Sequence, residues 1–172
     1  MNNKAFFLDK DGVLVDNSSY PKIPGDHILE NDILLGLKYI QEKGYKLIII
    51  SNQPWISKGL MSSEKVDKIF KSIIKKLEEK GIFIDDYSYC PHQTSDKCDC
   101  KKPKIKLGLE MASKHNINLK DSFVVGDMDS DINFGKNLGV KTVLVKTGRG
   151  KDFINYGADY IIENLNKIGE IV

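Results

Sequence analysis

The chain has 172 residues, with 26 basic and 24 acidic side chains, a formal net charge of +2 and 41% hydrophobic residues. This composition is typical of one globular domain, and the balanced charge argues against nucleic acid as the main partner. No apolar run approaches the ~20 residues of a membrane-spanning helix, and a predicted strand begins too near the N-terminus for a signal peptide. We therefore expect a monomeric, single-domain cytoplasmic protein over residues 1–172 that binds neither nucleic acid nor membrane.

Stretches typical of strands and helices alternate along the chain. A strand is expected at 5–8, and the polar residues 17–31 are predicted to form a long loop or flap. The apolar pattern then predicts helices at 33–43, 62–80, 105–116 and 131–138, interleaved with strands at 46–50, 86–90, 122–126, 141–145 and 159–162. This alternation implies an α/β fold, a Rossmann-like three-layer α/β/α sandwich with a mostly parallel central sheet. In such sheets, ligands bind at the carboxyl ends of the strands.

Two aspartates, Asp9 and Asp11, follow the first predicted strand and precede a glycine. Side chains two residues apart in a strand share a face, so both carboxylates can converge on one point. Such carboxylates repel each other unless a cation lies between them, and hard oxygen ligands suit Mg²⁺. A carboxylate beside Mg²⁺ can attack phosphorus and form an aspartyl-phosphate. The alternative is a turn whose aspartates only accept hydrogen bonds from backbone amides.

Two later segments carry groups that suit a phosphate. Ser51-Asn52-Gln53 follows a predicted strand and offers a hydroxyl, amide side chains and backbone N–H groups, although a plain turn is the alternative. Lys101 and Lys102 precede a proline and can steady the charge of an aspartyl nucleophile and of an incoming phosphate. The alternative for the lysines is a solvated basic patch.

A second acidic cluster, residues 127–131, reads Asp-Met-Asp-Ser-Asp. It is not an EF-hand loop, because Ile132 replaces the required glycine and Leu138 replaces the bidentate glutamate. Asp129 is expected to cap the helix that follows. The two histidines without a motif, His27 and His115, are expected to lie on the surface.

Three cysteines and a histidine lie close together in the sequence: Cys90, His92, Cys98 and Cys100. In a reducing compartment, such a cluster is more typical of a metal site than of disulfides. Two pairs of ligands, each with one intervening residue, can close around one ion, and three sulfurs with one nitrogen suit structural Zn²⁺. The alternative is three buried free cysteines and a surface histidine. We therefore expect a zinc-binding loop at about 90–103.

Taken together, these segments resemble the four motifs of the haloacid dehalogenase-like (HAD) phosphatases, in the family's order and over about residues 5–150. The resemblance implies a HAD-like fold without a large cap domain and a Mg²⁺-dependent phosphomonoesterase. It implies that Asp9 is the nucleophile and Asp11 the general acid/base, and that Ser51 and Lys102 are catalytic contacts of the phosphoryl group. It also implies a Mg²⁺ site formed by Asp9, Asp11 and Asp127, with Asp131 supporting these ligands without binding the ion. Asn52, Gln53 and Lys101 are expected to bind substrate.

Two groups within this family share Ser/Thr-Asn-Gln and the Cys-Pro-His…Cys-x-Cys arrangement, namely the heptose bisphosphate and the histidinol phosphate phosphatases. The chain departs from both at Pro54-Trp55, at Met128 and at Lys101, which stands where relatives have arginine. The late segment 142–150 resembles the heptose group, so a small phosphorylated sugar, glycero-manno-heptose 1,7-bisphosphate, is the expected substrate. Histidinol phosphate is the alternative, because the short gap between the cysteine pairs resembles that group.

Two other classes of function are weighed against the phosphatase. A phospho-accepting receiver would carry its acceptor aspartate after the third strand, where this chain has Cys90-Pro91-His92. A zinc module that binds nucleic acid would need aromatic residues among the basic residues 101–106, and there are none. The phosphatase is therefore the expected function.

Overall fold

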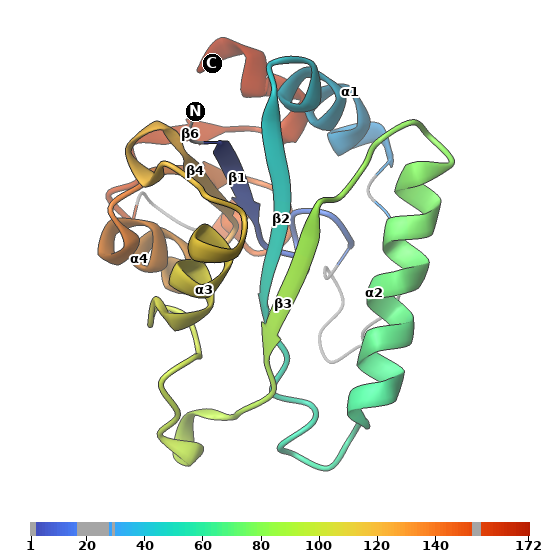
Figure 1. Ribbon diagram of the computed structural model, residues 1–172, viewed down its shortest axis with the longest axis vertical. Helices are drawn as coiled ribbons and strands as arrows, with labels where there is room; N and C mark the ends of the chain where they lie inside the picture. Colours follow the sequence, from blue (N-terminus) through green and yellow to red (C-terminus); the bar gives the residue numbers. More distant parts are fainter. Residues whose placement is uncertain (1–2, 17–27, 29, 153–155) are drawn as a thin grey trace.

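The computed structural model describes residues 3–16, 28, 30–152 and 156–172 (Figure 1). Six strands form one sheet in the order β3-β2-β1-β4-β5-β6, and each neighbouring pair is parallel. The strands are β1 (Lys4–Leu8), β2 (Tyr45–Asn52), β3 (Asp86–Cys90), β4 (Phe123–Gly126), β5 (Lys141–Val145) and β6 (Tyr160–Ile162). The sheet was predicted to be mostly parallel, and among the described residues it is entirely so.

Successive residues of β1 face opposite layers of the fold. Phe6 and Leu8 belong to a core shared with α1 and α2, whereas Ala5 and Phe7 belong to a second core shared with α3 and α4. The helices are α1 (Glu30–Glu42), α2 (Ser63–Glu78), α3 (Lys106–Lys114) and α4 (Asp129–Leu138). Figure 1 shows the two pairs of helices on opposite sides of the strands, which confirms the predicted three-layer sandwich. A strand covered on both faces is apolar throughout, as β1 is after its first residue.

The helix α2 illustrates how the sequence sets the ends and the buried face of an element. The Ser62 hydroxyl accepts a hydrogen bond from the Lys65 N–H at 3.3 Å and caps the helix. After the helix, the chain turns through Gly81, whose φ of 79° favours glycine. The buried positions follow the helical repeat: Val66, Phe70, Ile73 and Leu77. The helix predicted at 62–80 is therefore confirmed, with slightly shorter ends.

Two predictions about single residues are wrong. Asp129 does not cap α4 but is its first residue; the cap is Met128, whose N–H donates to Asp131 Oδ2 at 3.2 Å. An acid at the third helical position can reach back to the cap in this way, so α4 begins two residues earlier than predicted. His115 is also not a free surface residue, because the end of α3 brings its Nε2 within 2.7 Å of Asp86 Oδ2 at the start of β3.

The carboxyl ends of β2, β1 and β4 lie side by side because these strands are parallel neighbours. Asp9 follows β1, Ser51 and Asn52 end β2, and Asp127 follows β4, so all of them meet at this edge of the sheet. Gly126, the last residue of β4, makes close packing possible there. A Cβ on Gly126 would lie 2.1 Å from the Cβ of Asp131, so only glycine lets the first turn of α4 approach the strand.

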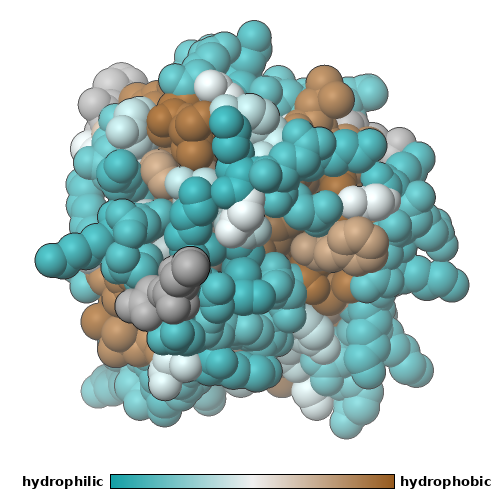
Figure 2. Space-filling view, turned by 45° about the horizontal axis from the view of Figure 1, so that its top comes forward, coloured by the Kyte–Doolittle hydropathy of each residue, from teal (hydrophilic) through white to brown (hydrophobic). Residues whose placement is uncertain are grey.

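Large hydrophobic side chains on the surface come from separate segments: Leu35, Leu60, Phe83, Leu109 and Ile161. Figure 2 shows a face on which hydrophilic side chains predominate and hydrophobic ones form separate patches. Within the ranges described, no helix is both long enough and apolar enough to span a bilayer.

Some expectations concern residues that the structure does not describe. The loop or flap predicted at 17–31 lies there almost entirely, and so does His27. Among the described residues, all strands belong to the one sheet and no cap domain is found. That residues 1–172 make up a single domain stays a prediction.

Candidate active site

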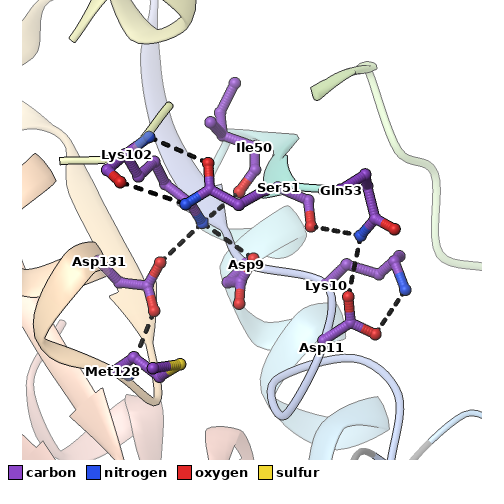
Figure 3. Close-up of polar contacts among 10 residues, drawn as sticks. Asp9, Lys10, Asp11, Ile50, Ser51, Gln53, Lys102, Met128 and Asp131 are labelled. Atoms are coloured by element: carbon purple, nitrogen blue, oxygen red, sulfur yellow. Dashed lines mark hydrogen bonds and ion pairs between the residues drawn. The ribbon is translucent and has the colours of Figure 1, made fainter. Parts of the chain in front are cut away.

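A buried lysine links three segments at the carboxyl edge of the sheet. The Lys102 ammonium lies 2.9 Å from Asp9 Oδ1, 2.7 Å from Asp131 Oδ1 and 2.6 Å from the backbone oxygen of Ile50 (Figure 3). The Lys102 side chain is only 3% exposed. The three partners come from the end of β1, the first turn of α4 and the strand β2, so one ammonium group joins all three elements.

The Asn52 side chain fixes the backbone from which Lys102 extends. Its Oδ1 accepts a hydrogen bond from the Lys102 N–H at 3.0 Å, and its Nδ2 donates to the Lys102 carbonyl oxygen at 3.2 Å. The sequence predicted that Asn52 contacts substrate. In the structure, both ends of its amide bind the backbone of Lys102, and a contact of Asn52 with substrate stays a prediction.

Three carboxylates, those of Asp9, Asp127 and Asp131, have oxygens within 4.8 Å of one another. Asp127 and Asp131 are buried, and Asp127 Oδ2 accepts a hydrogen bond from the Arg149 N–H at 2.8 Å. A compact set of hard oxygen donors with this negative charge could hold a divalent cation such as Mg²⁺. The carboxylate of Asp11, which was expected to be a ligand, is not a member of this group, whereas that of Asp131 is.

Burial and neighbouring charges change the pKa values in this group. Burial raises the pKa of the Asp9 carboxyl to about 7; the Lys102 ammonium opposes the rise, while the carboxylates of Asp131 and Asp11 add to it. Burial lowers the pKa of Lys102, but Asp131 and Asp9 outweigh that effect and hold the pKa above its usual range. Lys102 is therefore a permanent cation, whereas Asp9 needs a further positive charge to stay ionised at neutral pH.

The Asp11 side chain is held from two sides. The Lys10 ammonium lies 2.5 Å from Asp11 Oδ1, and Gln53 Nε2 donates to Asp11 Oδ2 at 2.9 Å (Figure 3). The same Gln53 nitrogen donates to the Ser51 hydroxyl at 2.9 Å. Gln53 and Ser51 are buried, as is Lys10, which is fully inaccessible to solvent. The contacts thus join the predicted residues Asp11, Ser51 and Gln53 into one hydrogen-bonded chain.

Lys10 is a residue that the sequence reasoning missed. Because lysine is almost never fully buried without a partner, the local composition did not predict that Lys10 would be buried. The available signal was its position between two aspartates at the end of a buried strand. A side chain there has little room to reach solvent, and a carboxylate is its nearest partner.

Lys101 lies differently from its neighbour Lys102. The Lys101 ammonium donates to the Thr94 hydroxyl at 3.1 Å and so contacts the loop that follows β3. Among the described residues, the Lys101 ammonium makes no hydrogen bond or ion pair with the carboxylates of the site. Its expected role in binding substrate therefore requires a substrate long enough to reach this loop.

The cysteine-rich loop gathers its four predicted ligands at one point. The Cys90 and Cys100 sulfurs are 3.1 Å apart, Cys90 and Cys98 are 3.6 Å apart, and His92 Nδ1 lies 3.4 Å from Cys100. All three cysteines are free. Sulfurs around a tetrahedral Zn²⁺ lie about 3.8 Å apart when each Zn–S bond is ~2.3 Å, so a slight expansion would admit the ion.

The thiols of this loop differ in acidity. Burial raises the pKa of Cys90 and of Cys100. For Cys98, burial also raises the pKa, but the backbone N–H groups of Cys100 and Lys101 outweigh it and lower the pKa to about 7. Because a metal binds the thiolate form, an ion that enters this cluster would displace protons from it.

The chain is similar to proteins whose family is known. A HAD-hydrolase-like family model matches residues 99–168. A D-glycero-beta-D-manno-heptose-1,7-bisphosphate 7-phosphatase of Helicobacter pylori is 35% identical over 144 residues, which cover 83% of both chains. A histidine biosynthesis bifunctional protein, HisB, of Buchnera aphidicola is 31% identical and covers 100% of this chain, but the match spans 48% of that protein.

A solved structure shares the fold over nearly the whole chain. It is a D,D-heptose 1,7-bisphosphate phosphatase from B. bronchiseptica, with a TM-score of 0.87, 23% identity and coverage of 97% of this chain and 96% of that one. The family model and the H. pylori relative confirm the HAD-like resemblance stated from the motifs. With its match to the family model and its 35% identity to a phosphatase over most of both chains, the protein belongs to the family of HAD-like phosphatases.

Proposed function

We propose that the protein is a Mg²⁺-dependent phosphomonoesterase that works through an aspartyl-phosphate on Asp9. The observation that carries this proposal is the buried contact of the Lys102 ammonium with both Asp9 and Asp131. A carboxylate steadied by a fixed cation at a ligand-binding edge is suited to attack the phosphorus of a phosphate ester. Membership of the HAD-like family supports the same chemistry.

The reaction takes two steps on these side chains. In the first, Asp9 attacks phosphorus, and the leaving oxygen departs with its electron pair and takes a proton from the Asp11 carboxyl. In the second, the Asp11 carboxylate takes a proton from a water whose oxygen attacks the same phosphorus, and the bond to Asp9 breaks. The Ser51 hydroxyl oxygen accepts a hydrogen bond from Gln53. The hydroxyl proton of Ser51 therefore remains available for donation to a phosphoryl oxygen.

We infer that Asp9, Asp127 and Asp131 would hold the Mg²⁺ ion. The fit rests on the donor set, in which three carboxylates converge and Lys102 supplies one positive charge. The solved structure from B. bronchiseptica is a complex with magnesium and phosphate, which supports the choice of ion. A bound Mg²⁺ would offset the charge of the carboxylates and of the phosphoryl group.

We infer that the substrate is D-glycero-D-manno-heptose 1,7-bisphosphate, from which the 7-phosphate is removed. The H. pylori relative, which carries that name, supports this choice, as does the late segment 142–150. Lys101 would meet the second phosphate, although a lysine lacks the bidentate geometry of arginine. Histidinol phosphate is the alternative, and the similarity to a protein of histidine biosynthesis favours it. We propose the cytoplasm as the place of the reaction and a monomer as the active form.

We infer that the cysteine-rich loop binds a structural Zn²⁺ through Cys90, His92, Cys98 and Cys100. The convergence of the four donor atoms within 4.8 Å supports this inference. All four ligands would be protein atoms, which is typical of a structural rather than a catalytic zinc. The ion would stabilise the loop that leads to Lys101 and Lys102.

The nucleophile is tested by replacing each aspartate with its amide. Asp9→Asn should abolish turnover, because an amide is a poor nucleophile. Asp11→Asn should lower kcat by about 10²–10⁴-fold and leave phosphate trapped on Asp9. Phosphate release with purified protein, together with mass spectrometry of the intact chain, measures both effects. Asp129→Asn, which changes an exposed acid at the start of α4, is the control; near-normal turnover in Asp9→Asn would show the assignment to be wrong.

The pKa of Asp9 makes Mg²⁺ binding depend on pH. Since that pKa is raised to about 7, Asp9 holds a proton below pH 7 that the ion must displace, and affinity should rise roughly tenfold per unit from pH 5 to 7 and then level off. Calorimetry in buffers of different ionisation enthalpy measures both affinity and proton release. Asp11→Asn should keep this dependence and Asp9→Asn should lose most of the affinity. A pH-independent dissociation constant between pH 5 and 8 would contradict the assignment.

The substrate is decided by comparing kcat/KM for both anomers of the heptose bisphosphate with kcat/KM for histidinol phosphate. We expect the heptose to be faster, and the reverse order would overturn the choice. Lys101→Ala should lower kcat/KM for the bisphosphate roughly tenfold while affecting a small monophosphate little, because a charge-assisted hydrogen bond is lost. Lys106→Ala, which removes a basic residue paired with Asp99 at 2.9 Å, is the matched control.

Metal analysis tests the zinc site. Reduced protein dialysed against Mg²⁺-free buffer should retain about one zinc per chain. Cys98→Ser should lose the metal and lower the melting temperature, because binding a structural metal contributes to folding. His115→Gln, a histidine outside the loop, should keep the zinc. Full activity in undamaged, reduced protein that contains no zinc would refute the site.

A further inference from the structure

Lys10 is a buried charge that the reaction described above does not use. Its side chain is fully inaccessible to solvent, and its ammonium lies 5.9 Å from the centre of the Phe70 ring, at the edge of the core formed with α2. An ammonium group in such surroundings needs a polar partner that accepts its hydrogen bonds. That partner is the Asp11 carboxyl group, whose Oδ1 lies 2.5 Å away.

Asp11 is more exposed than the two residues that hold it, so its buried partners can fix its orientation. The Asp11 side chain is 29% exposed, whereas Lys10 is fully buried and Gln53 nearly so. Each buried partner holds a different oxygen of Asp11, Lys10 on Oδ1 and Gln53 on Oδ2 (Figure 3). Two fixed donors therefore set the plane of a carboxylate that would otherwise turn in the open site.

The two leading aspartates also have separate lysines. Lys102 engages Asp9 and Asp131, while Lys10 engages Asp11 from within the core. Asp11 thus neither competes for the Lys102 ammonium nor joins the carboxylates that could hold a metal. The division keeps one carboxylate for phosphorus and the metal and the other for protons.

We propose that Lys10 is a positioning residue that, together with Gln53, orients the Asp11 carboxyl group for its two proton transfers. This inference rests on the proposed phosphatase function. It assigns Lys10 no contact with substrate and no proton of its own to transfer. Its effect should therefore appear only in steps that use Asp11.

A substrate with a good leaving group separates those steps. With p-nitrophenyl phosphate, nitrophenolate leaves without a proton, so forming the aspartyl-phosphate needs little from Asp11, whereas its hydrolysis still requires Asp11 to activate water. Lys10→Met removes the ammonium and keeps an apolar stem of similar length. We expect a burst of about one nitrophenolate per active site at a near-normal rate, followed by steady-state turnover at least about tenfold slower than wild type.

The phosphorylated fraction of the enzyme, trapped by acid quench and measured by mass spectrometry, should rise in Lys10→Met. Lys10→Arg, which keeps the cation, should restore most of the steady-state rate. Lys46→Met is the control, because it removes another short ion pair, 2.7 Å to Asp85, at the end of β2 far from the site, and it should change neither phase. An equal fall in burst and steady-state rates, or no change in either, would overturn the proposal.

A second measurement applies if the single variant Lys10→Met does not fold. The pair Asp11→Asn and Asp11→Asn/Lys10→Met removes the buried charge together with its partner. If Lys10 acts only through Asp11, the second change should lower turnover no further, and a large additional loss would overturn the proposal. The proposed function fails separately, if wild-type protein releases no phosphate with Mg²⁺ or if Asp9→Asn still becomes phosphorylated.

Discussion

The arrangement of the site depends on one buried ammonium group. Lys102 is almost wholly withdrawn from solvent and lies within hydrogen-bonding distance of Asp9, Asp131 and the carbonyl of Ile50. Removing one partner of a buried ion pair typically costs about 3–5 kcal/mol, because the charge left behind is neither solvated nor paired. The Lys102 ammonium therefore stabilises the approach of the start of α4 to the ends of β1 and β2, which are themselves paired neighbours in the sheet.

The position of that ammonium is determined by groups outside the acidic cluster. Asn52 at the end of β2 grips both the N–H and the carbonyl of Lys102, and Cys100 lies two residues earlier in the chain. A metal in the cysteine-rich loop would thus act on catalysis at a distance, by fixing the backbone that carries Lys102. We propose that the cysteine-rich loop serves to position Lys102.

The two lysines of the site do different work because their surroundings differ. Lys102 reaches the acids from a loop and is held at its backbone, whereas Lys10 is fully buried and reaches Asp11 from beside the Phe70 ring. Asp9 and Asp11 are only two residues apart, yet each has its own cation. Each of the two carboxylates can therefore be held in place without competing with the other for the same ammonium group.

Much of the fold could be read from the sequence. The alternation of apolar runs with amphipathic stretches predicted the strands and helices, and it implied a parallel sheet whose carboxyl ends carry Asp9, Ser51 and Asp127. The order of the four motifs was sufficient to predict the HAD-like family. These features are local or depend on chain order, because strand and helix periodicity and the sequence of motifs are written along the backbone.

Contacts between distant segments could not be read in the same way. The sequence placed Asn52 and Asp11 among the site residues but did not give their protein partners: the folded chain turns the Asn52 amide to Lys102, 50 residues away, and holds Asp11 between Lys10 and Gln53. It also placed His115 on the surface, where packing of α3 against β3 brings it to Asp86. The sequence by itself therefore determined the elements and the set of reactive side chains, and the tertiary structure decided which donor meets which acceptor. The physical reason is that a side chain's partner depends on the packing of whole elements, which residue spacing does not encode.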